Sequence, residues 1–200
     1  MNYVFGAVIG YLLGCINMAG IIAKKRGINI KAVGSNNAGA SNVFISVGKL
    51  YGIFVGACDI LKSFSAAYLT FILFEGNKEA ALLAGAMAVV GHNFPFWMHF
   101  NGGKGLAPFM GIVLFYDWKV FLIFAVVIAA ATLITDFIVI GTFSVTALMP
   151  LYTVFIAKDY FAFGVFFLLG VLIWYKHRVN MKRIANGTEI GFLRKNKIKK

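Results

Sequence analysis

The sequence is poor in charge: only 13% of its 200 residues are charged, whereas soluble domains carry about 25%. Hydrophobic residues make up 60% of the chain, which is more apolar surface than a small globule can bury. This composition excludes a soluble globular domain and a disordered chain. The apolar residues come in long runs and do not alternate with polar ones over about ten residues, which excludes a transmembrane barrel and indicates membrane helices.

Residues for several familiar chemistries are also missing. The two cysteines, Cys15 and Cys58, lie in apolar runs, which argues against a disulfide framework. No spacing of histidine and cysteine suits a metal ion, and we expect neither a metal nor another cofactor. A Gly-x-Ser-x-Gly nucleophile motif is absent too. An enzyme with this sequence would therefore work by positioning its substrates and stabilising charge.

The apolar runs predict an all-α, polytopic membrane protein with about seven transmembrane helices in a single domain, residues 1–200. The expected spans are residues 3–23, 50–74, 80–97, 106–116, 120–135, 137–157 and 160–175. The fourth span is short, because eleven helical residues rise only about 17 Å. Either it borrows residues from the glycine-rich segment before it, or that segment enters the membrane.

Positive charge follows the apolar runs. The net charge is +12, and the largest basic clusters are residues 24–26 and the tail from about 176 to 200. This distribution is typical of the cytoplasmic ends of membrane helices and argues against nucleic acid as a partner. It predicts an outside N-terminus, a cytoplasmic C-terminus and a first helix that is not a cleaved signal peptide.

Three polar segments on the predicted cytoplasmic side could form a site. Residues 34–42 are rich in Gly, Ser and Asn, which suits an anion-binding backbone nest or an ordinary connector. Residues 92–105 place a lysine in a glycine loop without Walker spacing, where it can hold a phosphate or snorkel to the interface. Residues 177–189 suit a phosphorylated substrate or a plain basic collar. The candidate residues are Gly34, Ser35, Asn37, Gly39 and Asn42, then His92, Gly102, Gly103, Lys104 and Gly105, then His177, Arg178, Asn180 and Glu189.

Two charged residues lie inside the second span. Asp59 and Lys62 are three residues apart, so they share a helix face and can neutralise each other. Each charge alone costs about 2.5–3.5 kcal/mol in a bilayer. We interpret them as a structural pair that supports a site, although intramembrane charges also fit a transporter. In the same span, Gly52 and Gly56 predict close helix packing.

The motifs, taken in order, resemble one known family. Nearly the whole chain carries them: Tyr11-Leu12-Leu13-Gly14, the segment 33–43, Asp59-x-x-Lys62, Gly91-His92-x-Phe94-Pro95, Gly102-Gly103-Lys104-Gly105, His177-Arg178-x-Asn180 and Gly187-Thr188-Glu189. The sequence is similar to the membrane glycerol-3-phosphate acyltransferases of bacteria that use acyl phosphate as donor, the PlsY family.

The resemblance implies a reaction. A fatty acyl group would pass from acyl phosphate to the 1-hydroxyl of sn-glycerol 3-phosphate, the first acylation of phospholipid synthesis, giving lysophosphatidic acid and phosphate without a metal or other cofactor. The protein would lie among the lipids of the bacterial inner membrane with its active site facing the cytoplasm, and would meet the acyl-phosphate-forming enzyme transiently. Ser35, Lys104 and His177 would be catalytic, and the other candidates would bind substrate.

The chain departs from the usual pattern of that family at several positions. Asn36 stands where a glycine is usual, Cys15-Ile16-Asn17 where Ser-Ile-Pro is usual, and Ile45 and Asn101 where basic residues are usual. Two alternatives stay open. One is a divergent paralogue that acylates another phosphorylated acceptor, and the other is a non-enzymatic membrane transporter or lipid-binding protein.

The charge distribution predicts the topology of the chain. Thiols engineered at Lys31 and Asn196 should react with an impermeant reagent only from the cytoplasmic side, because basic segments between membrane helices remain there. Labelling of either position from the outside would contradict this orientation.

Overall fold

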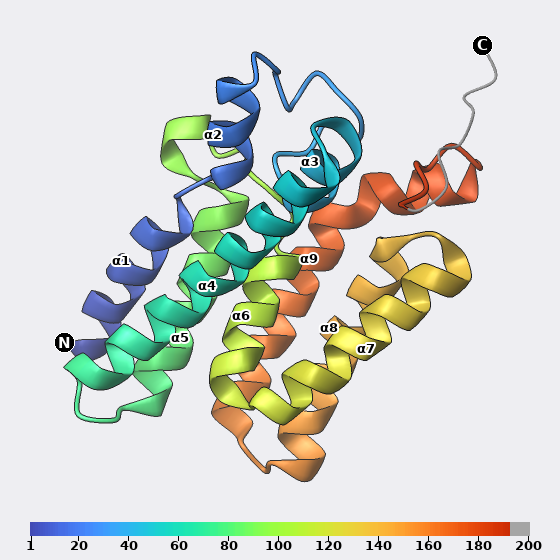
Figure 1. Cartoon of the computed structure of the whole chain (residues 1–200). Helices are drawn as coiled ribbons and strands as arrows, with labels where there is room; N and C mark the ends of the chain where they lie inside the picture. Colours follow the sequence, from blue (N-terminus) through green and yellow to red (C-terminus); the bar gives the residue numbers. More distant parts are fainter. Residues whose placement is uncertain (193–200) are drawn as a thin grey trace. The chain divides into compact units, whose positions relative to one another are not determined.

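The computed structural model describes residues 1–192, and every regular element in that range is a helix (Figure 1), which confirms the all-α prediction. The labelling position Asn196 lies outside the described residues. Within them, six helical segments are long and apolar enough to cross a membrane: Asn2–Lys25, Lys49–Leu73, Lys78–Met98, Trp118–Thr135, Ile138–Ile156 and Tyr160–Ala185. A further apolar helix, α6 (Leu106–Tyr116), is as short as the sequence predicts.

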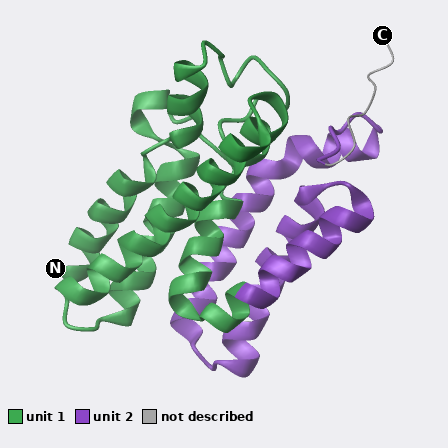
Figure 2. Cartoon of the chain, viewed as in Figure 1, with its two compact units in different colours: residues 1–121 green, residues 122–200 purple. Residues whose placement is uncertain are grey.

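The chain divides into two compact units, Met1–Phe121 and Leu122–Lys200 (Figure 2). Unit 1 contains α1 (Asn2–Gly14), α2 (Met18–Lys25), α3 (Ala40–Ser46), α4 (Lys49–Leu73), α5 (Lys78–Asn93), a 3-10 turn (Phe96–Met98) and α6. Unit 2 contains most of α7 (Trp118–Thr135), then α8 (Ile138–Leu151) with a π-helical turn (Tyr152–Ile156), and α9 (Tyr160–Ala185). The first two polar segments and the intramembrane charged pair belong to unit 1, and the third polar segment belongs to unit 2.

Polar turns separate the long helices close to the predicted positions. Asn77 begins α5 by accepting a hydrogen bond from the Ala80 amide at 2.9 Å, and Asp159 begins α9 by accepting one from the Ala162 amide at 2.9 Å. Asp136 adopts a left-handed conformation, with φ 65°, between α7 and α8. Each cap satisfies a backbone N–H that lacks an intrahelical partner, so these residues define where the helices begin.

The first span is broken between α1 and α2, a feature that hydropathy does not predict. Asn17 caps α2 by accepting a hydrogen bond from the Gly20 amide at 2.7 Å. Its Nδ2 donates to the Ala38 carbonyl at 3.0 Å. The side chain of Asn17 is 2% exposed, so these partners replace water. One buried asparagine therefore both starts the second half of the span and ties it to the first polar segment.

The carbonyl groups released at this break are satisfied by other elements. The Cys15 carbonyl accepts a hydrogen bond from Trp97 Nε1 at 2.8 Å, and the Ile16 carbonyl accepts one from Lys62 Nζ at 2.9 Å. Backbone polar groups at membrane depth need partners inside the protein, and each unsatisfied group costs several kcal/mol. Trp97 and Lys62 therefore stabilise a break that would be unfavourable without them.

Helix α1 packs against α5 through small residues. Gly6, Gly10 and Gly14 are spaced four apart and are all buried. A Cβ at Gly10 would collide with the backbone of Ala84, and one at Gly14 would collide with the backbone of Ala88. The two backbones therefore touch along one stripe, as in small-xxx-small packing of membrane helices.

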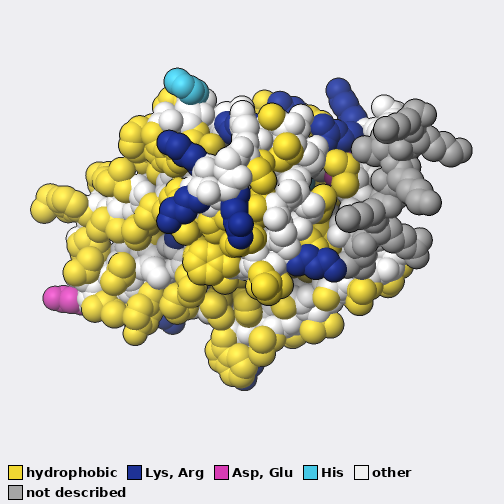
Figure 3. Space-filling model, turned by 45° about the horizontal axis from the view of Figure 1, so that its top comes forward, with side chains coloured by type: hydrophobic (Ala, Val, Ile, Leu, Met, Phe, Trp, Pro, Cys, Tyr) yellow, Lys and Arg dark blue, Asp and Glu magenta, His cyan; other side chains and the backbone are white. Residues whose placement is uncertain are grey.

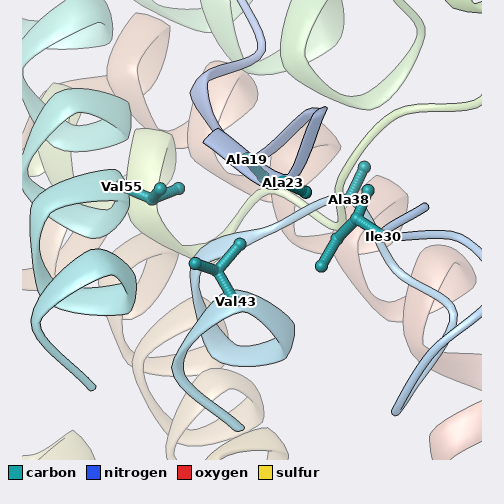
Figure 4. Packing of buried hydrophobic residues seen from close by; sticks show 6 residues of the cluster. All are labelled: Ala19, Ala23, Ile30, Ala38, Val43 and Val55. Atoms are coloured by element: carbon teal, nitrogen blue, oxygen red, sulfur yellow. The ribbon is translucent and has the colours of Figure 1, made fainter. Parts of the chain in front are cut away.

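A buried apolar cluster closes one end of unit 1, where α2 and α3 lie (Figure 1). It consists of Ala19, Ala23, Ile30, Ala38, Val43 and Val55, and Figure 4 shows these side chains together. Gly52 on α4 allows α3 to approach, because a Cβ there would collide with Phe44. At Gly56 the contact is ordinary, with Ala40 Cβ 3.6 Å from the added atom. The cluster holds the first polar segment on a packed base.

The glycine stripe of α1 predicts a stability effect. Gly10→Leu should lower the free energy of unfolding by about 1–3 kcal/mol or more, because the new side chain must push α1 away from α5. Thermal unfolding in detergent measures this change. Gly164→Leu is the matched control, since nothing lies within 4 Å of a Cβ added there. Equal midpoints for the two variants would contradict the packing argument.

Candidate functional site

The first polar segment is organised by Asn42, whose side chain is 0% exposed. Its Oδ1 accepts hydrogen bonds from the Ser35 amide at 2.9 Å and the Ser46 hydroxyl at 3.2 Å. Its Nδ2 lies 2.9–3.0 Å from three carbonyl oxygens, those of Ile30, Val33 and Asn37, which share its two N–H donors. Both ends of this amide are thus engaged by the loop, so Asn42 shapes the segment that carries the half-buried side chains of Ser35 and Asn37.

Close approach and backbone conformation explain the small residues of this segment. Gly34 has φ 57°, and an added Cβ would collide with Asn42 Oδ1 and Ser46 Oγ. Asn36 has φ 60°, a left-handed conformation that asparagine adopts more readily than most residues with a side chain. A Cβ at Gly39 would lie 2.8 Å from Asn37 Nδ2. Asparagine at position 36 is therefore compatible with the loop shape that a glycine would also allow.

The second polar segment folds back onto the end of α5. The amide of Gly102 donates to the Asn93 carbonyl at 3.0 Å, and the amide of Gly103 donates to the His92 carbonyl at 3.0 Å. An added Cβ would collide with the His92 carbonyl at Gly102 and with the His92 ring at Gly103. These two glycines thus hold the segment against α5, and their amides are directed to the protein.

Lys104 follows this anchored glycine pair directly. Its side chain is half-buried, and Gly105 after it has φ 99° and forms the N-cap of α6. The left-handed Gly105 keeps the preceding segment out of α6, so the short span does not borrow residues from it. The structure thus places the lysine between a rigid turn and the positive end of a helix, an arrangement favourable to an anion.

Lys31, which the sequence analysis uses only to predict topology, links the loop before the first polar segment to the second one. Lys31 Nζ donates to the Asn101 carbonyl, so both segments lie at the same end of unit 1. Partial burial lowers the pKa of the Lys31 ammonium group. Figure 3, turned so that the upper end of Figure 1 comes forward, shows Lys and Arg side chains standing among apolar ones. A loop lysine has no sequence signal that identifies such a contact.

The predicted intramembrane pair of Asp59 and Lys62 forms, and a histidine contacts it. Lys62 Nζ lies 2.7 Å from Asp59 Oδ1 and 2.9 Å from His92 Nδ1. His92 Nδ1 lies 3.4 Å from the same carboxylate oxygen. Asp59 and His92 are 1% and 3% exposed, so the cluster is shielded from water and lipid. Since the His92 ring also touches Gly103, the intramembrane charges reach the second polar segment.

The third polar segment is described within unit 2. His177 and Asn180 lie on the buried side of α9, and Glu189 folds back so that its Oε1 accepts a hydrogen bond from Asn180 Nδ2. His177 Nδ1 lies 2.8 Å from the Ile173 carbonyl. Arg178 is exposed and packs over the Tyr175 ring at 4.0 Å.

The structure therefore joins the predicted site residues in part. It brings the first and second segments together within unit 1, with Asp59 and Lys62 behind them, and it groups His177, Asn180 and Glu189 within unit 2. The convergence of both groups in one pocket stays a prediction. Within residues 1–192, no cluster of three His, Cys, Asp or Glu side chains is arranged to hold a metal ion.

Known proteins resemble this chain over nearly its whole length. A protein called glycerol-3-phosphate acyltransferase 1 from Oceanobacillus iheyensis is 39% identical over 94% of this chain and 94% of its own length. A glycerol-3-phosphate acyltransferase from Desulfotalea psychrophila is 34% identical over 98% of this chain and 100% of its own length.

Solved structures agree with these relatives. The crystal structure of PlsY (YgiH), an integral membrane glycerol 3-phosphate acyltransferase, in its glycerol 3-phosphate form is 30% identical, has a TM-score of 0.89 and covers 96% of each chain. The lysophosphatidic acid form of PlsY matches with a TM-score of 0.87. The family model described as glycerol-3-phosphate acyltransferase matches residues 4–187. This chain is an integral membrane acyltransferase, and it belongs to the glycerol-3-phosphate acyltransferase family.

Proposed function

We propose that this enzyme transfers a fatty acyl group from acyl phosphate to the 1-hydroxyl of sn-glycerol 3-phosphate. The observation that carries the proposal is the contact between Lys31 and the Asn101 carbonyl, which holds the loop leading into the first polar segment beside the second polar segment. The glycerol 3-phosphate and lysophosphatidic acid forms of PlsY support this acceptor and this product. The order of the motifs, which resembles that of acyl-phosphate-dependent enzymes, supports the donor.

The chemistry requires positioning more than a strong base. Acyl phosphate is an activated donor, so the acceptor hydroxyl oxygen can attack its carbonyl carbon directly. The bond from that carbon to the phosphate oxygen breaks, a new ester bond forms, and the hydroxyl proton leaves with the phosphate. The products are lysophosphatidic acid and inorganic phosphate, and no covalent acyl-enzyme is needed.

The donor is assigned to the segments of unit 1. Lys104 holds its phosphate and stabilises the charge that develops on the leaving group. Ser35 and Asn37 orient the phosphate and the carbonyl from the loop that Asn42 shapes. Because the amide of Asn42 is engaged within that loop, we assign it a positioning role instead of the predicted contact with substrate. The glycines of both segments likewise act by fixing the backbone around the donor; they are Gly34, Gly39, Gly102, Gly103 and Gly105.

The acceptor is assigned to the segment of unit 2. His177 and Asn180 bind glycerol 3-phosphate, and exposed Arg178 meets its phosphate. Glu189 orients Asn180 through the hydrogen bond between their side chains. The pairing of Asn180 with Glu189 supports a preorganised amide at this position.

The proposed location follows from the helices and the charge. The enzyme lies in the bacterial inner membrane with its site at the cytoplasmic face, where a phosphorylated acceptor is soluble and the acyl chain of the donor stays in the bilayer. A reaction that makes acyl phosphate must supply the donor. The enzyme that catalyses that reaction can bind this acyltransferase transiently. Membership of an acyltransferase family favours this activity over the transporter alternative.

The proposed activity is tested by release of phosphate from palmitoyl phosphate by the purified protein. Release should require sn-glycerol 3-phosphate and should match the lysophosphatidic acid formed. Activity with another phosphorylated acceptor and none with glycerol 3-phosphate would favour the divergent paralogue. Activity with an acyl thioester in place of acyl phosphate would overturn the proposed donor.

Lys104 is predicted to contribute strongly to the rate. Lys104→Ala should lower kcat by about 10²–10³, because one preorganised donor that acts on the transition state contributes that much. Lys119→Ala is the matched control, since Lys119 lies beyond α6 at the start of α7. A rate for Lys104→Ala within threefold of the control would remove the lysine from the proposed mechanism.

Direct transfer predicts that no acyl group attaches to the protein. Intact-mass spectrometry after mixing the enzyme with palmitoyl phosphate alone should show the unmodified mass, because the donor needs no enzyme nucleophile. Hydroxylamine treatment controls for labile esters and thioesters. A stable adduct on Ser35 or Cys15 would show that the reaction proceeds through an acyl-enzyme.

A further inference from the structure

The Lys62 ammonium group is surrounded by acceptors from three parts of unit 1. Its Nζ lies 2.7 Å from Asp59 Oδ1 on α4, 2.9 Å from the Ile16 carbonyl at the break of the first span, and 2.9 Å from His92 Nδ1 on α5. The Asp59 carboxylate pairs with its charge, and the Ile16 carbonyl and His92 Nδ1 both lie within hydrogen-bond distance of the ammonium group. Neutralising the charge requires only Asp59, and the contact with His92 therefore needs a separate explanation.

The contact with His92 decides where the imidazole carries its proton. The Ile16 carbonyl and the Asp59 carboxylate lie 2.9 Å and 2.7 Å from Lys62 Nζ, and this pair of oxygen acceptors favours the charged ammonium group there. The Asp59 carboxylate also lies closer to Lys62, at 2.7 Å, than to His92 Nδ1, at 3.4 Å. The cation is therefore on Lys62, which donates to Nδ1. A neutral imidazole that accepts at Nδ1 carries its proton on Nε2.

The Nε2 side of the ring faces the second polar segment. A Cβ built on Gly103 would collide with the His92 ring, and Nε2 is the ring atom nearest to it. The Gly103 amide also donates to the His92 carbonyl at 3.0 Å. Side chain and backbone of one histidine thus support the turn that comes directly before Lys104.

We propose that Lys62 is a positioning residue: it fixes His92 in the Nε2–H tautomer, and the imidazole so fixed sets the Gly102–Lys104 turn for the donor phosphate. The effect on the rate rests on the proposed function. The tautomer itself does not, because it follows from the contacts of Lys62, Asp59 and His92.

Nitrogen-15 NMR of histidine-labelled protein in nanodiscs tests the tautomer directly. The chain has three histidines, and His92→Gln identifies the signal of His92 by its loss. We expect a neutral ring in the wild-type protein at pH 7, with Nδ1 unprotonated and Nε2 protonated. A proton on Nδ1, in a neutral ring or in an imidazolium, would overturn the proposal without need of a variant.

Substitution of Lys62 tests the coupling to the reaction. Lys62→Met keeps a long side chain but removes the donor to Nδ1, and the double variant Asp59→Asn/Lys62→Met does so without an unpaired carboxylate. In both variants we expect loss of the fixed tautomer and a decrease in kcat of about 10²-fold, the scale of a small misplacement of catalytic groups. Ser63→Ala is the matched control, because it removes another buried link from α4 to α5, the 3.0 Å hydrogen bond to the Gly85 carbonyl, without touching His92.

Conservative changes at His92 separate positioning from packing. The amide nitrogen of glutamine can reach the place of Nε2–H, whereas the shorter asparagine side chain cannot. His92→Gln should therefore retain more of kcat than His92→Asn, at similar unfolding temperatures. If the Lys62 variants keep the wild-type tautomer and kcat, or if Ser63→Ala lowers kcat equally, Lys62 has no positioning role. Absence of phosphate release in the wild-type enzyme would instead overturn the proposed function and leave the NMR result unaffected.

Discussion

A carboxylate, a backbone carbonyl and an imidazole nitrogen converge on the Lys62 ammonium group, and each comes from a different part of unit 1. Removal of this cation would leave a buried carboxylate without its charge partner and the Ile16 carbonyl without its donor, each at a cost of several kcal/mol at membrane depth. The break in the first span, the position of α5 against α4 and the turn before Lys104 all depend on it. Insertion of the Lys62 charge into the bilayer is unfavourable, yet this charge links α4, α5 and the break of the first span.

The span boundaries could be predicted because they depend on local chemistry. Helix α6 begins after Gly105 and ends before Asp117, as the sequence indicates, since a left-handed glycine and a polar residue interrupt an apolar run. The break at Cys15-Ile16-Asn17 could not be predicted, because two of these three residues are apolar and the segment Asn2–Lys25 still contains an 18-residue window with a mean hydropathy of 1.9. Its stability depends on Lys62 and Trp97, which lie 46 and 82 residues away in the chain.

Residue types indicate which segments are polar and rich in glycine, but they do not indicate which partner each donor binds. Asn42 and the pair Gly102-Gly103 were expected to face substrate, yet the donors of all three bind carbonyl groups of the protein. A sequence shows that an amide or a backbone N–H is present, but its partner is decided by tertiary packing. Asn36 is the opposite case. It departs from the glycine usual in the family, and its φ of 60° shows why the loop accepts it.

The glycine stripe of α1 has a consequence for biosynthesis. Its partner surface is on α5, and Ala84 follows Gly10 by 74 residues. At about 5–20 residues per second, translation needs roughly 4–15 s to supply that surface. During this interval α1 is already in the bilayer with a groove of bare backbone that only lipid chains can fill. Because α5 is synthesised later, α1 cannot pack against it at once. When the two helices assemble, lipid must leave the groove before their backbones can touch.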